Sequence, residues 1–320
     1  MRNRRFSHPA LTLPAVTALG GGHGLAASLS ALRRITNRLT AIVTVADDGG
    51  SSGRLRQEFG ILPPGDLRMA LAALCGEDDV ERTWAQVLQS RFAGEGPLAG
   101  HSIGNLLIAG LWQYLPEPVA GLEMVAQLLR IQGRVLPMSL VPLIIEADVR
   151  PSAAAAATVV TGQEAVALAQ GEIERVRLVP ENPPAAPEAV AAVNNADYVV
   201  LGPGSWYSSV MPHLLVPELA RALRSTSAHR ILNLNLAATA DETGGYTASR
   251  HLEALLQHAP GLRFETLIVD PSFAAKDGSL EDWAYRLGAN LVLADVRSPD
   301  GSPQHDPEKL ATVFRTVMHL

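Results

Sequence analysis

The chain has 320 residues and a mass of 33.9 kDa, of which 47% are hydrophobic, so one large α/β unit with a sizeable core fits. The net charge of −6 argues against a nucleic-acid partner, which would favour a basic face. No apolar run approaches the ~18 residues of a membrane span, and the single cysteine, Cys75, excludes an internal disulfide. We therefore expect a cytoplasmic protein with no membrane insertion.

The first predicted segment is a disordered tail over residues 1–14. Its arginines and the apolar stretch after them imitate a signal peptide, but Pro14 breaks that stretch and a glycine loop follows directly. We expect residues 15–320 to form a single domain.

A strand, a glycine loop and a helix open this domain. Residues 16–19 are apolar as in a buried strand, and residues 25–33 have the composition of a helix. The loop between them consists of Gly20, Gly21, Gly22, His23 and Gly24. Backbone N–H groups and the helix dipole would make it an anion site for a diphosphate. A glycine turn that only allows close helix–strand packing fits nearly as well, and His23 could donate to a phosphate or face solvent.

The most informative string follows the next predicted strand, residues 39–45. It runs from Ala46 to Arg56, and its candidate residues are Asp47, Asp48, Gly49, Gly50, Ser51, Ser52 and Arg54. Glycine N–H groups and hydroxyls can donate to phosphate oxygens, and the arginine can neutralise their charge. The aspartates would hold a cation, a ligand hydroxyl or an arginine. A solvated Asp-Gly turn accounts for only part of the string, so we favour a site for a phosphorylated ligand.

Two predicted helix starts, before residues 67–74 and before a later apolar helix, carry further candidates. These are Gly65, Asp66, Arg68, His101 and Asn105. Asp66 is a helix cap or a ligand contact, and Arg68 is a ligand contact or a surface charge. The last two lie four residues apart and share a helix face. They contact a ligand or form a capping pair against a neighbouring strand.

Strand-like and helix-like segments alternate along most of the chain, which predicts a doubly wound, mostly parallel sheet of the Rossmann-like α/β class. The later predicted strands are residues 196–201, 231–236, 266–270 and 290–295, and a closing helix covers residues 306–320. Between about 134 and 184 the character changes, since residues 140–148 and 172–179 are strand-like with partial alternation. We expect a smaller β-rich insertion or cap there.

The polar strings fall at the carboxyl ends of predicted strands or at helix starts that can face the same edge. Further residues at such ends are Gly202, Pro203, Gly204, Ser205, Asn235, Glu242 and Thr243. Ligands of open α/β sheets bind outside the carboxyl ends of the strands, so we predict one composite cleft. Gly202–Ser205 is a second phosphate loop or a proline–glycine turn. Glu242 and Thr243 would orient a ligand hydroxyl or form a plain acidic turn.

Several catalytic constellations are absent from the sequence: a serine-centred nucleophile elbow, a metal-spaced His/Cys cluster and the H-E-x-x-H motif. Asp47 and Asp48 are adjacent and point opposite ways on a strand end, so they are not a glycosidase-type pair. His229, His251 and His258 have polar, helix-like surroundings, and we interpret them as surface residues.

Six strings together are specific to one family. They are Gly20–Gly24, Thr44–Arg54, Ile61–Asp66, Gly100–Leu106, Gly202–Ser205 and His305-Asp306. With these strings the chain, from about Val16 to its end, resembles the YvcK-type "putative gluconeogenesis factor" family, which is related to the CofD-type 2-phospho-L-lactate transferases. The long aspartate-glycine-serine string and Ile61–Asp66 resemble the YvcK branch.

The resemblance implies a Rossmann-like, nucleotide-binding cytosolic protein, often a homo-oligomer, that binds UDP-sugars such as UDP-N-acetylglucosamine. It also implies a link between gluconeogenic growth, envelope synthesis and cell shape, with envelope-synthesis proteins as partners. By this analogy Gly20–Gly24 and Gly202–Ser205 take the nucleotide and diphosphate, and Asp47 and Asp48 serve the sugar. In a transferase the same aspartates would instead hold Mg²⁺ and the acceptor hydroxyl.

Four positions depart from the family pattern. His23 stands where threonine is usual, Met69 and His213 stand where asparagine is usual, and Gln304 replaces an arginine that often precedes His-Asp. Loss of a charge-assisted hydrogen bond costs about 1.5–3 kcal/mol, which would alter the affinity for the ligand or its identity.

Three functions remain open at this point. The first is a nucleotide-sugar-binding regulator without turnover, because the sequence offers an anion cleft but no obvious nucleophile or tuned base. The second is a Mg²⁺-dependent phosphoester transferase that uses Asp47 or Asp48. The third is a structural partner of envelope-synthesis enzymes with an inherited cleft. We favour the first.

Overall fold

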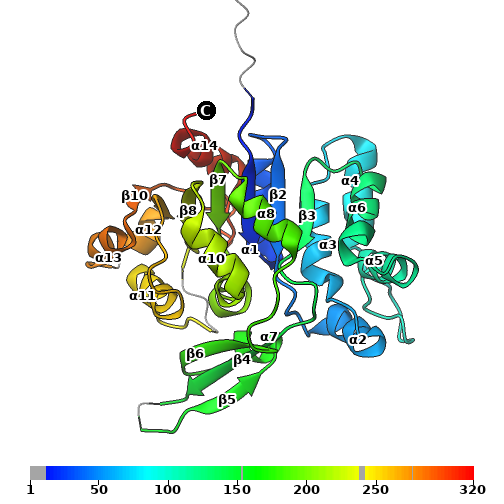
Figure 1. Ribbon diagram of the computed structural model, residues 1–320, viewed down its shortest axis with the longest axis horizontal. Helices are drawn as coiled ribbons and strands as arrows, with labels where there is room; N and C mark the ends of the chain where they lie inside the picture. Colours follow the sequence, from blue (N-terminus) through cyan, green and yellow to red (C-terminus); the bar gives the residue numbers. More distant parts are fainter. Residues whose placement is uncertain (1–11, 153, 238–241, 276) are drawn as a thin grey trace, which may run out of the picture.

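Seven parallel strands form the central sheet of this computed structural model, which describes residues 12–152, 154–237, 242–275 and 277–320. Across the sheet they are β10 (Asn290–Leu293), β9 (Thr266–Val269), β8 (His229–Asn233), β7 (Tyr198–Leu201), β1 (Val16–Gly20), β2 (Leu39–Val43) and β3 (Arg134–Pro137). The predicted Rossmann-like parallel sheet is confirmed (Figure 1). Residues 1–11 of the predicted tail lie outside the described residues.

The central strands are apolar because helices cover both faces of the sheet. Every residue of β1 and of β9 is buried, as expected for parallel strands between two helix layers. The chain order reverses beside β1, since β2 and β3 follow on one side and β7 to β10 on the other. The carboxyl ends of β1 and β7 therefore flank a topological switch point, where ligands bind in sheets of this class.

The helices of one face include α1 (Gly22–Leu32), α3 (Pro64–Ala73) and α14 (Pro307–Val317), and those of the other include α8 (Pro187–Asn194) and α10 (Pro217–Ser225) (Figure 1). The remaining helices are α2 (Gly50–Phe59), α4 (Asp79–Gln89), α5 (Ile103–Tyr114), α6 (Pro118–Leu128), α9 (Pro212–Leu215), α11 (Ala248–His258), α12 (Pro271–Ala274) and α13 (Leu280–Leu287). Acidic caps start several of them. Asp78 opens α4 with a capping box, and Asp306 accepts from two backbone N–H groups at the start of α14.

A smaller antiparallel sheet is inserted between β3 and β7. Its strands are β5 (Thr158–Thr161), β4 (Ile144–Arg150) and β6 (Glu172–Val179), with the short helix α7 (Gln163–Ala167) after β5. This insertion lies at the carboxyl edge of the large sheet (Figure 1). Its predicted start near residue 134 is too early, because β3 pairs with β2 in the large sheet. Its residues, Arg-Val-Leu-Pro, hold only two apolar side chains in a row, so the sequence shows no strand-like run there.

The core position of α14 gives a stability prediction. Phe314 is fully buried, and removing a buried aromatic side chain costs about 3–5 kcal/mol. We expect Phe314→Ala to lower the free energy of unfolding in urea by this amount. Thr316→Ala, at an exposed position of the same helix, should change it by less than about 0.5 kcal/mol. A Phe314 variant as stable as this control would contradict the assignment of the core.

Candidate functional site

Two glycine loops meet at the switch point and border one groove. The loop Gly21–Gly24 follows β1, and Pro203–Ser205 follows β7. Asn235–Ala237, after β8, and the loop before α14 complete the walls. The groove has a volume of about 810 Å³, which is typical of a small-molecule site. The structure thus brings together three of the sequence strings predicted to share a cleft.

The first turn of α1 approaches the second loop so closely that residue 24 has to be glycine. A Cβ atom at Gly24 would lie 2.3 Å from the carbonyl oxygen of Pro203. At Gly21 a Cβ atom would lie 2.5 Å from Oδ2 of Asp66. The residues of this first turn also line the groove. Backbone N–H groups at a helix start have no partner within the helix, so those of α1 can donate to an anion there.

A pair of hydrogen bonds fixes the second loop. Oδ1 of Asn235 accepts from the N–H of Gly204 at 2.9 Å, and Nδ2 of Asn235 donates to the carbonyl oxygen of Gly204 at 2.8 Å. Ser205 and Ser209 continue this side of the groove and line it with hydroxyl groups. Asn235 therefore positions the loop in addition to lining the groove.

The two glycines that precede these loops lie behind them. Nε2 of His213, which is fully buried, donates to the carbonyl oxygen of Gly20 at 3.1 Å. Burial lowers the pKa of His213 to about 4, so the ring is neutral at neutral pH. Gly202 has a φ of +78°, and a Cβ atom there would lie 2.6 Å from the carbonyl oxygen of Asn233. His213 therefore supports β1 and does not line the groove.

Glu242 and Thr243 are buried behind the second loop. Glu242 accepts from the N–H of Tyr207 at 3.2 Å, at the start of the π-helical turn η1 (Trp206–Val210). Burial raises the pKa of Glu242 to about 7, although hydrogen bonds from the backbone of η1 favour the ionised form. Its role in the described structure is to cap η1, and neither residue is among those that line the groove.

A carboxylate pair, Asp47 and Asp66, adjoins the first glycine loop. Asp66 has a hydrogen bond with the backbone of Gly22, and burial followed by repulsion from Asp47 raises the pKa of Asp66 to about 7. Burial also raises the pKa of Asp47, which bonds to Ser52. A Cβ atom at Gly65 would lie 2.3 Å from Oγ of Ser52 and 2.7 Å from Oδ2 of Asp47. Gly65 thus lets α3 approach α2 at this cluster.

A buried network holds the start of α2 next to this pair. Oγ of Ser51 accepts from Nδ2 of Asn105 at 3.1 Å and from the N–H of Ser102 at 3.4 Å, so it donates its own proton to Nδ1 of His101 at 3.0 Å. The predicted pair His101 and Asn105 does meet at one point. Gly50, the first residue of α2, is exposed and has a φ of +47°.

The insertion contacts the region around Asp47 and Asp48, here called the acidic end of the site, through α7. Oδ1 of Asp48 accepts from the N–H of Glu164 at 3.2 Å, and Nε2 of Gln163 donates to the carbonyl oxygen of Ser208 at 3.0 Å. A Cβ atom at Gly49 would lie 3.0 Å from Oε2 of Glu164. The negative charge of Glu164 also contributes to the raised pKa of Asp47. Helix α7 therefore connects the loop after β2 with η1.

The two predicted arginines point away from the groove. Arg54 is exposed and donates to the carbonyl oxygens of Ala99 at 2.9 Å and Pro97 at 3.4 Å. Arg68 is buried and donates to the side chain of Gln89 and to the carbonyl oxygen of Leu88 at 3.5 Å. Arg54 thus holds the loop before α5 in place, and Arg68 holds the end of α4.

Several groove residues were not singled out from the sequence. They are Ala26, Ala27, Ser30, Ser209, Leu236, Ala237, Ser298, Pro303 and Pro307. Gln163 and Glu164, which contact Ser208 and Asp48 outside the groove lining, were not singled out either. The exposed face of α1 follows from helical spacing after the glycine loop, and Ser209 belongs to the same string as Gly204. For Gln163 and Glu164 the sequence contains no local signal.

Neither a metal-binding cluster nor a membrane-spanning helix is present in the described part of the chain. No three His, Cys, Asp or Glu side chains there lie together as a metal site requires. No helix there is long and apolar enough to cross a membrane.

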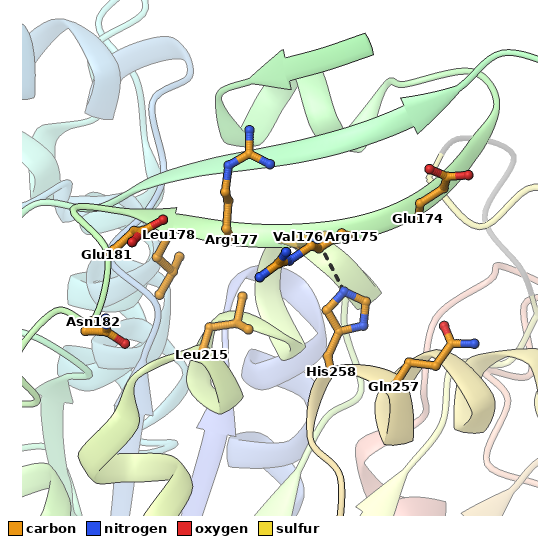
Figure 2. Close-up of a pocket in the computed structure, with 10 residues that line it drawn as sticks. All are labelled: Glu174, Arg175, Val176, Arg177, Leu178, Glu181, Asn182, Leu215, Gln257 and His258. Carbon is orange, nitrogen blue, oxygen red and sulfur yellow. Dashed lines mark hydrogen bonds between the residues drawn. The ribbon is translucent and has the colours of Figure 1, made fainter. Parts of the chain in front are cut away.

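A second cavity, of about 540 Å³, lies between β6 and the helices α9 and α11 (Figure 2). No predicted ligand-binding residue lines it. Nε2 of His258, which lines this cavity, accepts from the N–H of Val176 at 3.0 Å. This hydrogen bond attaches β6 of the insertion to α11. His251 is fully buried, with its ring 5.2 Å from that of Trp206. The prediction that these two histidines are surface residues is wrong, because α11 turns them against β6 and η1.

Comparisons with known proteins agree with this fold. Residues 16–298 match the family described as "2-phospho-L-lactate transferase CofD". A "Putative gluconeogenesis factor" of Mycobacterium tuberculosis is 54% identical over 308 residues, which cover 94% of this chain and 90% of the relative. A "Gluconeogenesis factor" of Listeria innocua is 35% identical over 318 residues, which cover 96% of each chain.

A solved structure points the same way. The crystal structure of a UPF0052 family member from Bacillus halodurans has a TM-score of 0.84 and 34% sequence identity, and the match covers 95% of this chain and 99% of that one. The chain therefore belongs to the CofD/UPF0052 family, whose members include proteins named gluconeogenesis factor. The resemblance inferred from the sequence strings is confirmed.

The close approach of α1 to the second loop predicts an asymmetry between two glycine substitutions. In Gly24→Ala the new methyl group would overlap the carbonyl group of Pro203, and we expect a loss of about 1–3 kcal/mol in the free energy of unfolding. In Gly110→Ala, on the exposed face of α5 with nothing within 4 Å, we expect a gain of about 0.5–1 kcal/mol. Equal effects in urea denaturation would show that the contact at residue 24 is looser.

The raised pKa of Asp66 predicts a pH dependence of stability. Folding raises this pKa from 3.8 to about 7, so the folded state holds the proton more tightly. The resulting stabilisation is complete below about pH 4 and is lost as the pH rises toward 7, at up to roughly 1.4 kcal/mol per pH unit. In Asp66→Asn, which cannot ionise, the free energy of unfolding should fall less over this range. In Glu242→Gln the free energy of unfolding should also fall less over this range, since the pKa of Glu242 is raised to about 7 as well. A wild-type pH profile in Asp66→Asn would refute the shift.

Proposed function

We propose that this protein is a cytoplasmic regulator that binds a nucleotide-sugar, UDP-N-acetylglucosamine or a close analogue, without turnover. The observation that carries the proposal is the groove at the switch point. The first turn of α1 and the loop Pro203–Ser205 are in contact and line it together, so that both backbone N–H groups and serine hydroxyls border it. Such groups bind a diphosphate through hydrogen bonds and the helix dipole.

Further residues in the groove, and two carboxylates beside it, suit the other parts of such a ligand. Ala26, Ala27, Pro303 and Pro307 give the groove an apolar section that fits the flat faces of a nucleobase and ribose. Asp47 and Asp66 adjoin the glycine loop on the other side, and carboxylates accept hydrogen bonds from sugar hydroxyls. In this arrangement the diphosphate lies between a nucleoside section and a sugar section.

Relatives named gluconeogenesis factor support a role in central carbon metabolism. We extend the proposal to a link between gluconeogenic growth, cell-envelope synthesis and cell shape, with envelope-synthesis proteins as partners and a homo-oligomer as the acting form. Cells that lack the protein should then lose normal shape on gluconeogenic carbon sources and regain it with the wild-type gene. Normal shape on such sources would argue against this role.

A transferase is the second candidate, because the matched family is described as a 2-phospho-L-lactate transferase. Mg²⁺ would then be held by Asp47 or Asp48, and it would neutralise phosphate charge. Asp48 already accepts from the N–H of Glu164, and no third metal-binding side chain lies with the pair among the described residues. The residues present fit a cation only if the phosphorylated substrate supplies further ligands.

A thermal-shift screen with UDP-N-acetylglucosamine, a GDP-sugar and NAD, each with and without Mg²⁺, separates the two functions. A ligand at about 100 times its dissociation constant adds about 2.7 kcal/mol to stability. We expect this gain with the UDP-sugar alone, in the wild type and in Gly110→Ala, and a smaller gain in Asn235→Ala, which frees the Gly204 peptide.

The screen is combined with phosphorus NMR of the ligands. We expect no product from any of them. Mg²⁺-dependent consumption of a nucleotide-activated phosphoester would establish the transferase instead, and stabilisation by none of the nucleotides would refute both.

A further inference from the structure

The outer strand of the small sheet has an open edge. Strand β5 pairs with β4 on one side, and no other described strand pairs with it on the other side. It is the strand of the insertion that lies farthest from the large sheet (Figure 1). Its sequence is Thr-Val-Val-Thr, and Val159 is 57% exposed. A β-branched strand with an open edge can bind a further strand through its backbone.

The direction of the backbone groups of β5 follows from its register. The N–H of Gly162 donates to the carbonyl oxygen of Ile145 at 2.8 Å, in continuation of the ladder between β5 and β4. In an antiparallel ladder only alternate residues bond to the neighbouring strand, so Val160 bonds toward β4. The N–H and C=O groups of Val159 and Thr161 therefore point to the open side.

The other outer strands of the two sheets have features that discourage such pairing. On β6 the N–H of Val176 already donates to His258 of α11. Strand β3 contains Arg134 and Pro137, and β10 is followed closely by Asp295. By contrast, β5 has neither a charge nor a proline, and residues 154–157 before it are all alanine.

The charges around β5 favour a second copy of this chain as the strand that pairs with it. A two-fold axis brings a residue of an edge strand close to its own copy, so a charge there would repel itself. The nearest charged row consists of Glu146 and Asp148 on β4, and Arg177 pairs with both at 2.8 Å. In the joined sheet this row would lie about 14 Å from its copy, which exceeds the Debye length of about 8 Å. An identical strand therefore meets no repulsion.

We propose that β5 is a dimerisation strand, which pairs antiparallel with β5 of a second copy and joins the two small sheets into one. A two-fold axis at Val159, normal to the sheet, sets its outward N–H and C=O groups against those of its own copy. Thr161 then faces Ala157 of the copy. The inference goes beyond the nucleotide groove, and it gives an interface to the homo-oligomer that the proposed function includes.

The size of this interface sets the expected affinity. One pair of four-residue strands is small compared with the roughly 1,200 Å² or more that stable complexes bury in total. We therefore expect a dimer that dissociates at micromolar concentrations.

Sedimentation velocity of the full chain without ligand, over about 1–200 µM, tests the proposal. We expect the wild type to pass from monomer to dimer over this range. Val159→Lys should raise the dissociation constant about tenfold or more, because two ammonium groups would meet across the axis. Val159→Thr, which keeps an uncharged β-branched side chain, should associate as the wild type does. Leu293→Lys is the matched control, since Leu293 is an exposed residue of the other outer strand β10, and it should also associate normally.

A charge exchange separates self-pairing from any other use of this edge. Val159→Glu alone should associate as weakly as Val159→Lys, whereas an equimolar mixture of the two should regain the dimer, because opposite charges then meet across the axis. Thermal unfolding of each variant checks that it is folded, as expected for an exposed position.

Two results would overturn the inference. If the wild type dimerises and folded Val159→Lys dimerises equally well, or if the mixture stays monomeric, the interface is not β5, and the proposed homo-oligomer uses another surface. If the wild type stays monomeric up to about 200 µM, the inference and the homo-oligomer both fail. Nucleotide-sugar binding is judged separately by the thermal-shift screen, so neither result decides it.

Discussion

The contact between the first turn of α1 and the loop after β7 is the constraint on which the rest of the site depends. It requires glycine at position 24, because the carbonyl group of Pro203 occupies the space of a side chain there. The contact joins the two halves of the doubly wound sheet at the point where strand order reverses. Asn235 then fixes Gly204 from the far side with two hydrogen bonds. The helix N-terminus, the serine-bearing loop and the groove that they line are therefore positioned as one unit.

Burial sets the electrostatics around this unit. Asp66 and Glu242 lie close to the two loops, and desolvation raises the pKa of each to about 7. Desolvation lowers the pKa of His213 and of His305 to about 4. In each case the neutral form is favoured, since a charge in a poorly solvated site is expensive. Among the described residues that line the groove there is no lysine or arginine, so the positive end of the α1 dipole acts there without a fixed cation beside it.

Much of the architecture is readable from the sequence because it is local in origin. Apolar β-branched runs define most strands, and glycine strings at their carboxyl ends mark the switch point. The strand β3 was not predicted because Arg134 and Pro137 leave only two apolar residues between them, which is no apolar run. The directions of Arg54 and Arg68 escaped because flexible side chains at a helix start can turn to any nearby carbonyl group, which only tertiary packing decides. The contact of Asp48 with Glu164 joins segments that are far apart in sequence, so no local pattern announces it.

The attachment of the inserted sheet joins distant parts of the chain. Helix α7 contacts Asp48 on one side and Ser208 on the other, and β6 is bonded to His258 of α11, whereas β5, at the outer edge of the small sheet, is largely exposed. Shifting the small sheet as a rigid body would therefore break contacts with three segments of the large domain at once.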